Sequence, residues 1–595
     1  MSHAPRIHRL RRAVTFASAA AIGACSSVST DAPASPIVLT QRTPCTGGTS
    51  VVIGASQGVR VDCSNGGTTV SVPGNGASYL IVPEFVTENP ALDQLVSYRM
   101  FADNPAAGSI SARRASPSSA AATLSSLGGH RVGSEIVPPS LAQMQADQIL
   151  RRKGRANYRA AQRATVFNRS PSFDLLADVA TPAVGSHRSF RVLSSFSQNT
   201  YATVGARLSF AGANVLLYVD TLAPPNGFTA EQLVAFGNNF DQTLYPIATS
   251  AFGAPSDLDQ NGRVIMLMSP KVNADSPSAT CNTIGYVAGF FDTVDFDGPS
   301  DPNSNQGEIF YSIVPDPAAT VSCAHSVSDL GTSIPATFLH ELQHLINFSQ
   351  HVVVNGLQPG ASWLDEGMSI AAEELGSLHY EQQCPPPACR TNAAQLFPDS
   401  SQGFANGFLY DSYQYALLPD TASITYGDDS QNGFSWRGGV WLLARWLGDQ
   451  HGNAIFQKLE RGPSDGIADI EQATGESFPS LFTRFGFALY VDSIPGSPRS
   501  AAPANMRFVS RNIRQLWARL FVTSSGASDV PRESPLLTYP VSRDSSLSVM
   551  LPGTTTYFRL NTPPTAARVT VEFSGPVGAA FSPTLGAQMG IFKLP

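Results

Sequence analysis

Short apolar stretches and longer amphipathic stretches alternate along the central part of the chain. Stretches rich in β-branched and aromatic residues predict strands at 190–196, 201–212, 213–220 and 263–270. Apolar residues at helical spacing predict helices over 228–253 and at about 334–350, 363–376 and 435–450. This mixture predicts an α+β domain over residues 184–530.

The regions on either side of this domain alternate apolar and polar residues between glycine-rich turns. We expect an N-terminal β-domain over 37–110 and a C-terminal β-domain over 531–595. Between them, residues 111–183 hold a basic stretch at 141–164 that is predicted to be helical. We interpret 111–183 first as a linker that processing could remove, and second as a helical arm that packs on the next domain.

The first residues have the pattern of an export signal. Arginines precede a short apolar stretch at 13–24, which is too short to span a bilayer and is typical of a signal peptide. The stretch ends in the sequence IGAC, which resembles the lipobox of bacterial lipoproteins. We expect a signal peptide at 1–24, a lipid anchor on Cys25 and a polar tether over 25–36. Plain secretion after cleavage near Ala24 is the alternative.

The cysteines fit an oxidising compartment. The chain has seven, and Cys25 would carry the lipid, which leaves an even number. Their closeness along the chain predicts three local disulfides, although other pairings are possible. The expected pairs are Cys45 with Cys63, Cys281 with Cys323, and Cys384 with Cys389.

Length and charge bear on the number of domains and on the class of partner. A chain of 595 residues is too long for one hydrophobic core, so several domains are expected. The formal net charge of −7 argues against nucleic acid as a partner, since phosphate binding needs a basic face. Membrane contact is expected only through the lipid anchor, and the oligomeric state stays open.

One helix carries a metal-binding pattern. His340 and His344 are separated by one helical turn, so a helix places both imidazoles on one face, and Glu341 can reach a metal-bound water. We expect this helix to begin at Thr332 or Ser333, with Pro335 in its first turn. The pattern predicts a zinc site with Glu341 as the general base.

A third ligand is suggested by a downstream segment. The stretch WLDEG, which contains Glu366, resembles the W-L-N-E-G segment in which gluzincins carry their glutamate ligand, with Asp365 in place of the asparagine. The metzincin alternative fits less well, because His351 is one residue too far from His344. Glu373 and Glu374 are expected to be supporting carboxylates, and Glu373 is the one to test as a partner of a ligand histidine.

The central region as a whole resembles hyicolysin-type bacterial metallopeptidases over about residues 185–460. The segments that carry the resemblance are AFGAPSDLDQNGRVIMLMSPKVN, GYVAGFFDTVDF, NQGEIFYSIVPDP, PATFLHELQHLINFSQH and SWLDEGMSIAAEELG. The resemblance implies a thermolysin-like gluzincin fold with zinc at His340, His344 and Glu366. Gln343 and Asn347 are assigned only packing or local hydrogen bonding.

Peptide hydrolysis by this fold also needs a donor for the developing oxyanion. Gluzincins use a tyrosine or histidine that follows the third ligand. The candidates here are Tyr410, Tyr413, Tyr415 and Tyr426. Tyr426, just before the helix at 435–450, is preferred, and a packed aromatic is the alternative for each.

A second cation is possible at the start of a calcium-like loop. Asp257, Asp259 and Asn261 place oxygen ligands at alternate positions before Gly262, which suits calcium. The loop lacks its bidentate glutamate, and a polar turn gives the same pattern. Further ligands would have to come from elsewhere in the fold; the candidates are Asp292, Asp295, Asp297 and Asp301.

Together these features predict an exported bacterial lipoprotein with a thermolysin-like zincin domain between two β-rich domains. It would be a zinc endopeptidase whose partner is a protein or peptide substrate. Two alternatives remain: a surface adhesion protein that keeps a peptidase scaffold, and a zinc hydrolase of a non-peptide substrate. The intact Glu341 argues against the scaffold, which has no need of a base.

Overall fold

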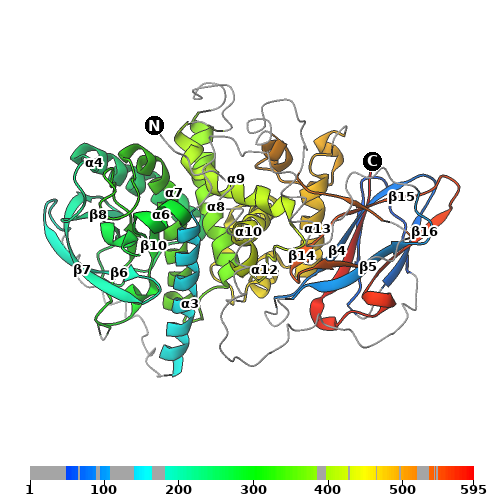
Figure 1. Ribbon diagram of the computed structural model, residues 1–595, viewed down its shortest axis with the longest axis horizontal. Coiled ribbons are helices and arrows are strands. Elements are labelled where there is room, and N and C mark those ends of the chain that lie inside the picture. The colour runs from blue at the N-terminus through cyan, green and yellow to red at the C-terminus, as the bar shows by residue number, and fades with distance from the viewer. Residues whose placement is uncertain are drawn as a thin grey trace.

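The computed structural model describes most of the chain. The described residues are 49–64, 68–88, 94–106, 140–163, 181–299, 301–384, 397, 399–426, 429–463, 465–494, 497–518, 535–541, 543 and 547–595. Three parts follow one another along the long axis in Figure 1: a sheet with its helices, a helical part, and a pair of β-sheets. The predicted signal peptide, Cys25 and the tether lie outside the described residues.

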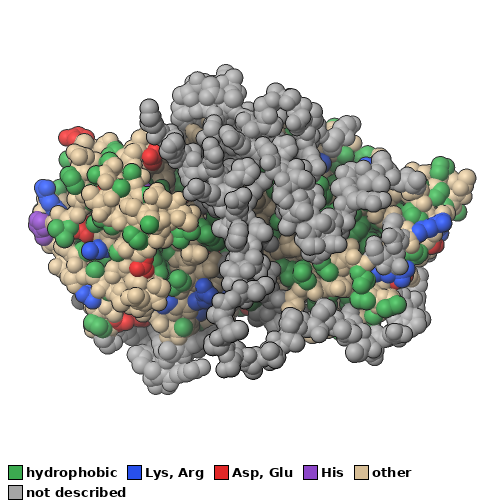
Figure 2. Space-filling model, viewed as in Figure 1, with side chains coloured by type: hydrophobic (Ala, Val, Ile, Leu, Met, Phe, Trp, Pro, Cys, Tyr) green, Lys and Arg blue, Asp and Glu red, His purple; other side chains and the backbone are tan. Residues whose placement is uncertain are grey.

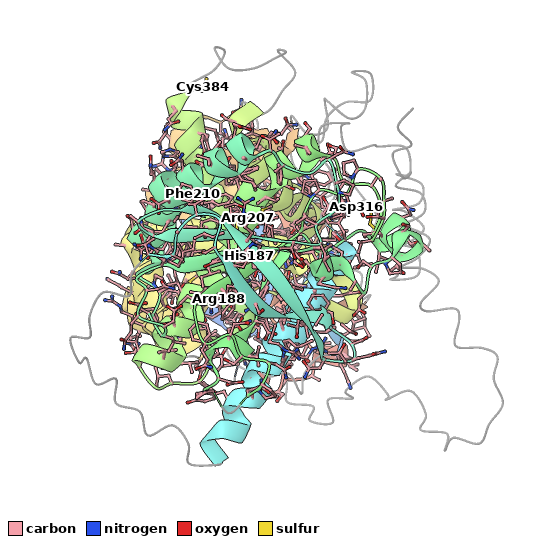
Figure 3. The ribbon with its side chains drawn as sticks, turned by 90° about the vertical axis from the view of Figure 1, so that its left-hand side faces the viewer. His187, Arg188, Arg207, Phe210, Asp316 and Cys384 are labelled. Carbon is pink, nitrogen blue, oxygen red and sulfur yellow. A yellow bond between two sulfur atoms is a disulfide. The ribbon has the colours of Figure 1, made fainter. Side chains whose placement is uncertain are left out.

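The first part is built on a six-stranded sheet in the order β10-β11-β9-β8-β7-β6. Its strands are β6 (His187–Ser195), β7 (Thr200–Ala211), β8 (Val215–Asp220), β9 (Val264–Met268), β10 (Gly289–Phe291) and β11 (Ile309–Ser312). The strands predicted between 190 and 270 are confirmed. Figure 3 looks onto the β6–β7 pair, where His187 and Arg207 are cross-strand partners. At the other end of the sheet, β10 runs antiparallel to β11.

Helices α4 (Ala230–Asn239) and α5 (Tyr245–Phe252) cover one face of this sheet. With the π-helical turn η2 (Phe240–Leu244) between them, they form the predicted helix over 228–253. It begins with a capping box, in which the Thr229 side chain accepts from the Gln232 amide and the Gln232 side chain accepts from the Thr229 amide. Shorter elements are η3 (Pro270–Asn273), α6 (Ser278–Ile284) and η4 (Thr293–Phe296).

The middle of the molecule is helical. Its elements are α7 (Val327–Phe348), η5 (Ser349–Val354), α8 (Ser362–Gln383), α9 (Asp399–Leu417), α10 (Asp429–His451), α11 (Ala454–Leu459), α12 (Ile467–Thr474) and α13 (Phe478–Val491), followed by η6 (Arg499–Ala501) and η7 (Ala504–Met506). The core shared by this part and the sheet is dominated by apolar side chains from α7, α8, α10 and α13.

The expected start of α7 was wrong. The helix begins more than a turn earlier than predicted, where Ser326 caps it by accepting from the Asp329 amide (3.0 Å). Pro335 therefore lies inside the helix instead of in its first turn. Proline is frequent in the first turn of helices and therefore favours a start near 335, whereas the mostly polar stretch between Ser326 and Ser333 gives little apolar periodicity that would indicate the true start.

The two β-rich ends of the chain do not form separate domains, and this prediction was wrong. One sheet has the order β1-β3-β16-β5-β13 and the other β12-β15-β4-β17-β2, with β14 paired to β4. Their strands are β1 (Thr49–Ser50), β2 (Gly58–Asp62), β3 (Thr68–Pro73), β4 (Ser78–Phe85), β5 (Val96–Ala102), β12 (Tyr539–Pro540), β13 (Leu547–Met550), β14 (Thr554–Thr555), β15 (Phe558–Asn561), β16 (Arg568–Ser574) and β17 (Ala587–Lys593). Strands from both ends pair and share one core. Alternation predicts strands, but it does not say which strands pair.

The basic stretch at 141–164 is a helix, α3 (Leu141–Arg163), as expected. The preferred interpretation as a linker is wrong for this helix, because α3 packs on the sheet part. Ala142, Ala146 and Leu150 are buried in the core on the face of the sheet opposite α7. Figure 1 shows α3 standing at the boundary between the sheet and the helices α8 and α9.

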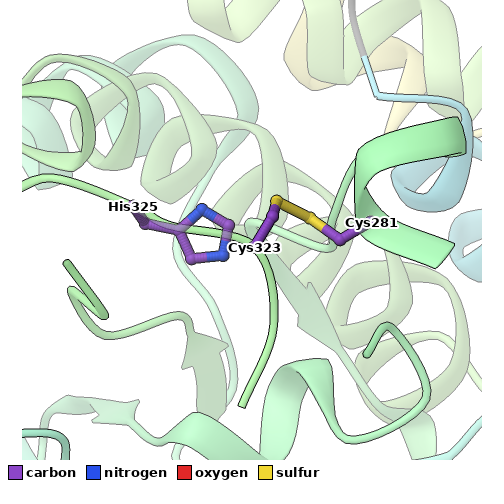
Figure 4. Close-up of side chains that lie close together, drawn as sticks. All are labelled: Cys281, Cys323 and His325. Atoms are coloured by element: carbon purple, nitrogen blue, oxygen red, sulfur yellow. A yellow bond between two sulfur atoms is a disulfide. The ribbon is translucent and has the colours of Figure 1, made fainter. Parts of the chain in front are cut away.

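One of the three predicted disulfides is confirmed. Cys281 and Cys323 form a disulfide with Cα atoms 5.5 Å apart, and Figure 4 shows His325 beside it. These three side chains lie close enough together to hold a metal ion. Because both sulfur atoms are part of the disulfide, however, they offer no thiolate to a metal. Cys384 is also disulfide-bonded. Cys45 and Cys389 lie outside the described residues, so their pairings stay predictions.

Two surface features bear on partners. On the face in Figure 2, the charged side chains of the described residues are scattered among uncharged ones. Among the helices of the described residues, none is both long and apolar enough to cross a membrane.

Candidate metal centre

Two helices bring the three predicted ligands together in the interior. His340 and His344 lie one turn apart on α7, and Glu366 lies in the first turns of α8. All three side chains are buried, with 5%, 1% and 3% exposure. Their ligand atoms lie close enough together to hold a metal ion. We call these three residues the metal group.

The spacing of these atoms fits a tetrahedral zinc ion. The two Nε2 atoms of the histidines are 3.2 Å apart. Glu366 places Oε2 3.7 Å from Nε2 of His340 and Oε1 3.5 Å from Nε2 of His344. Ligand atoms about 2 Å from a tetrahedral zinc are about 3.3 Å from one another. The residues present therefore fit the metal that the sequence predicted.

The other ring nitrogen of each histidine faces a carboxylate. Nδ1 of His340 lies 2.7 Å from Oε1 of Glu373, and Nδ1 of His344 lies 2.9 Å from Oδ2 of Asp365. These contacts fix the ring orientation and leave Nε2 for a metal. Burial also lowers the pKa of His340 well below its usual range, which favours the neutral form that binds metal.

The expected supporting role of Glu373 is thus matched by a direct contact with a ligand histidine. Asp365 makes the equivalent contact, but the sequence assigned it no role. The signal was present in the sequence, since Asp365 directly precedes Glu366. It could not be interpreted without knowing the distance between α7 and α8.

Glu341 lies between the two histidines and is fully buried. Its Oε2 accepts a hydrogen bond from the Phe291 amide of β10 (2.9 Å), and its Oε1 has no hydrogen-bond partner among the described residues. Burial raises the pKa of Glu341 well above its usual range. A carboxyl with one free oxygen beside a metal group has the position and the proton affinity of a general base.

A buried glutamate binds two side chains of α7. The side-chain amides of Gln343 and Asn347 donate to the two oxygens of Glu460, at 2.8 Å and 2.7 Å. All three residues are at most 3% exposed. Gln343 and Asn347 do form hydrogen bonds, but with a distant residue and not locally as expected, and Glu460 was not predicted.

Two arginines near the metal group were also missed. Arg437 of α10 donates to Oε2 of Glu366 (2.9 Å) and lies 3.4 Å from Oδ2 of Asp147. Arg151 of α3 lies 3.8 Å from both Glu341 and Glu366. No local pattern marks these residues, because their partners lie far away along the chain.

The remaining candidates have different outcomes. His351 binds the Asn347 carbonyl through Nδ1 (3.1 Å) and is not part of the metal group, in line with its spacing. Tyr415 is fully buried and is near Thr555 of the β-sheets. Tyr426 is half-buried in the turn after α9, and its role stays a prediction.

The calcium-like loop gains one carboxylate. Asp257, Asp259 and Glu308 offer oxygens within 4.8 Å of one another, and Glu308 was not among the residues expected there. Asp292 instead contacts Lys153, and Asp295 accepts from the Tyr311 hydroxyl. Calcium binding at this loop stays a prediction.

Comparisons with known proteins agree with the geometry. No known family profile matches the chain. The neutral metalloprotease ShpI of Staphylococcus hyicus is 28% identical over 190 residues, which is 32% of this chain and 40% of that relative. The match covers less than half of the relative's length. The chain is therefore a distant homologue of a metalloprotease and carries a buried group of two histidines and a glutamate.

Proposed function

We propose that the protein is a zinc-dependent endopeptidase that acts on proteins or peptides outside the cytoplasm, with a thermolysin-like catalytic domain. The observation that carries the proposal is the tetrahedral spacing of His340, His344 and Glu366 with Glu341 buried beside them. The distant homology to a metalloprotease supports the same conclusion.

The metal would be held by Nε2 of both histidines and by Glu366. When bound, zinc polarises the scissile carbonyl and acidifies the attacking water. Glu341 takes the proton of that water on its unpartnered Oε1 and delivers it to the leaving amine. Asp365 and Glu373 hold the imidazoles in the ligand orientation.

Zinc content and chelator sensitivity test the proposal. The purified full-length chain should contain about one zinc per molecule, as expected for a single three-ligand site. It should cleave casein or members of a peptide library, and a chelator should abolish cleavage until zinc is restored. A chain that binds no zinc contradicts the metal site. Zinc binding without cleavage of any peptide favours a non-peptide substrate or a binding role.

Tyr426 remains our choice for the oxyanion donor. Tyr426 follows the proposed third ligand in the sequence, as the donor residue does in gluzincins. Its hydroxyl would donate the hydrogen bond to the oxyanion. Tyr426→Phe should lower kcat by about 10²–10³-fold with little change in KM, because the hydrogen bond forms only in the transition state. Tyr415→Phe is a suitable comparison, since Tyr415 is near the β-sheets. Unchanged kcat in Tyr426→Phe would remove Tyr426 from the mechanism.

Export is supported by the Cys281–Cys323 disulfide, a bond that is typical of oxidising compartments. The proposed lipid anchor rests on the lipobox-like sequence before Cys25. Cys25→Ser should move the protein from the membrane fraction to the soluble fraction of expressing cells. Equal distribution of both forms would exclude the anchor.

A further inference from the structure

Helix α3 presents a polar stripe to the metal group. The residues of the stripe recur every four positions, which places them on one face of a helix. They are Gln143, Asp147, Arg151 and Arg155. The neighbouring stripe, Ala142, Ala146 and Leu150, is buried in the core of the sheet. Helix α3 therefore lies along the edge of the sheet, with one stripe in the core and the next directed toward the metal group.

At one end of the stripe, Gln143 binds the backbone of the edge strand β10. Its Nε2 donates to the Gly289 carbonyl (2.8 Å), and its Oε1 accepts from the Ala288 amide (2.7 Å). A side-chain amide offers the same donor and acceptor as a peptide unit. An extended peptide that adds to a sheet edge binds such backbone groups. Gln143 thus makes the contacts that a peptide ligand would make at this edge.

The middle of the stripe reaches the catalytic residues. Arg151 lies 3.8 Å from Oε2 of Glu341 and 3.8 Å from Oε1 of Glu366. Asp147, which is 1% exposed, accepts from Gln143 (2.7 Å) and lies 3.4 Å from Arg437. The Phe291 amide of the same strand, β10, donates to Glu341. The edge of β10 therefore ends beside the proposed general base. Helix α3 covers this approach to the base.

The C-terminal part of α3 binds the segment that precedes α8. Arg155 donates to the Gly360 carbonyl, and the Tyr158 hydroxyl donates to the Gly356 carbonyl (3.2 Å). Helix α3 is thus attached both to the edge of the sheet and to the segment that leads into the Glu366 helix. It spans both sides of the approach to the metal group.

We propose that α3 is an autoinhibitory helix: it occupies the edge of β10 beside the metal group and must move aside before an extended peptide can bind there. The inference rests on the proposed peptidase function. At its centre, α3 is held by charge attraction and not by hydrogen bonds. The Nη2 and Nε atoms of Arg151 lie 3.8 Å from carboxylate oxygens of Glu341 and Glu366 and have no hydrogen-bond partner among the described residues.

Two variants loosen α3 by independent means. Gln143→Ala combined with Arg151→Ala removes contacts with the edge strand and with the carboxylates. Gly154→Leu acts by size, because a Cβ at Gly154 would lie only 2.9 Å from Cγ2 of Thr293. Leucine favours the helix more than glycine does, so this variant disturbs the docking of α3 and not its helicity. Arg152→Ala is the matched control, since Arg152 is exposed and donates to Gln148 within α3.

Peptide affinity is the readout. All variants are made in the zinc-loaded full chain with Glu341→Gln, which prevents cleavage. A fluorescein-labelled, unstructured casein peptide is titrated by fluorescence anisotropy, and circular dichroism confirms folding. If α3 competes with the peptide, both loosened variants should bind about tenfold or more tightly than Glu341→Gln alone, because the open fraction limits the apparent affinity. Arg152→Ala should not change the affinity.

Equal affinity in all variants, including equally absent binding, would overturn the proposal. Weaker binding in the loosened variants would also overturn it, since α3 would then be part of the peptide site. The same α3 variants with Glu341 restored separate the two claims. Tighter peptide binding without any cleavage supports the competition between α3 and the peptide and rejects the peptidase. Cleavage together with unchanged peptide affinity supports the peptidase and rejects the competition between α3 and the peptide.

Discussion

Nδ1 of His344 lies 2.9 Å from Oδ2 of Asp365, and the two residues belong to different helices, α7 and α8. Asp365 directly precedes Glu366, the proposed third ligand. The contact therefore links the orientation of one ligand to the position of another. A change at Asp365 should affect metal affinity before it affects the fold.

Asp365→Ala is expected to weaken zinc binding by about 10–100-fold, because His344 loses the carboxylate that orients its ring. Asp365→Asn keeps an oxygen acceptor and should lose less. Zinc affinity is measured in competition with a chromophoric chelator. Unchanged affinity in Asp365→Ala would show that the contact does not position the ligand.

Glu460 should contribute to stability through Gln343 and Asn347. Glu460→Ala leaves two buried side-chain amides without an acceptor, which should cost on the order of 1–3 kcal/mol. Glu460→Gln keeps one acceptor and should cost less. Thermal unfolding of the zinc-loaded proteins measures both effects. Equal midpoints for wild type and Glu460→Ala would contradict the role given to this network.

Glu84 should make stability depend on pH. It is fully buried where β4 meets α13, accepts from Thr483 (2.6 Å) and Gln588 (2.7 Å), and burial raises its pKa to about 8. A raised carboxyl pKa means that the folded state holds a proton that the unfolded state releases above about 4.5. The stabilising effect of protonation is complete below that pH and is lost as the pH rises to about 8.

Glu84→Gln removes this dependence while keeping the shape of the side chain. Relative to the wild type, its free energy of unfolding should rise by on the order of a few kcal/mol between about pH 4.5 and pH 8. Denaturant unfolding at several pH values gives the comparison. A constant difference between the two proteins across this range would show that Glu84 does not titrate in the folded state.

The sequence predicted the helix that carries His340 and His344 and four of the six strands of the sheet β10-β11-β9-β8-β7-β6, because these depend on spacing within a single element. Strands β10 and β11 were not predicted. His340 and His344 share a helix face, so their proximity follows from the helical repeat. The third ligand needed a resemblance to known proteins, since Glu366 lies on another helix. Glu373 was suspected because it lies two turns beyond Glu366, and its contact with His340 depends on how α7 and α8 pack.

Contacts between distant segments could not be predicted. Arg151 of α3 lies near Glu341 on α7, and Arg437 of α10 binds Glu366 on α8. Glu460, which directly follows α11, binds two side chains of α7. Nothing in the local sequence of these three residues marks them. The β-rich ends show the same limit at a larger scale. The pairing of β4 with β17 joins residues at opposite ends of the chain, although β-rich structure was correctly predicted at each end.

The central claim is that Glu341 is the base of a zinc peptidase, and Glu341→Gln tests it most directly. Zinc content and cleavage of casein peptides are measured for the wild type, Gly154→Leu, and each of them with Glu341→Gln. Loss of the base should leave about one zinc per chain and lower kcat by about 10²–10⁴-fold, since glutamine keeps the shape but cannot accept the proton. Undiminished cleavage by Glu341→Gln, or the absence of zinc from every form, would contradict the claim.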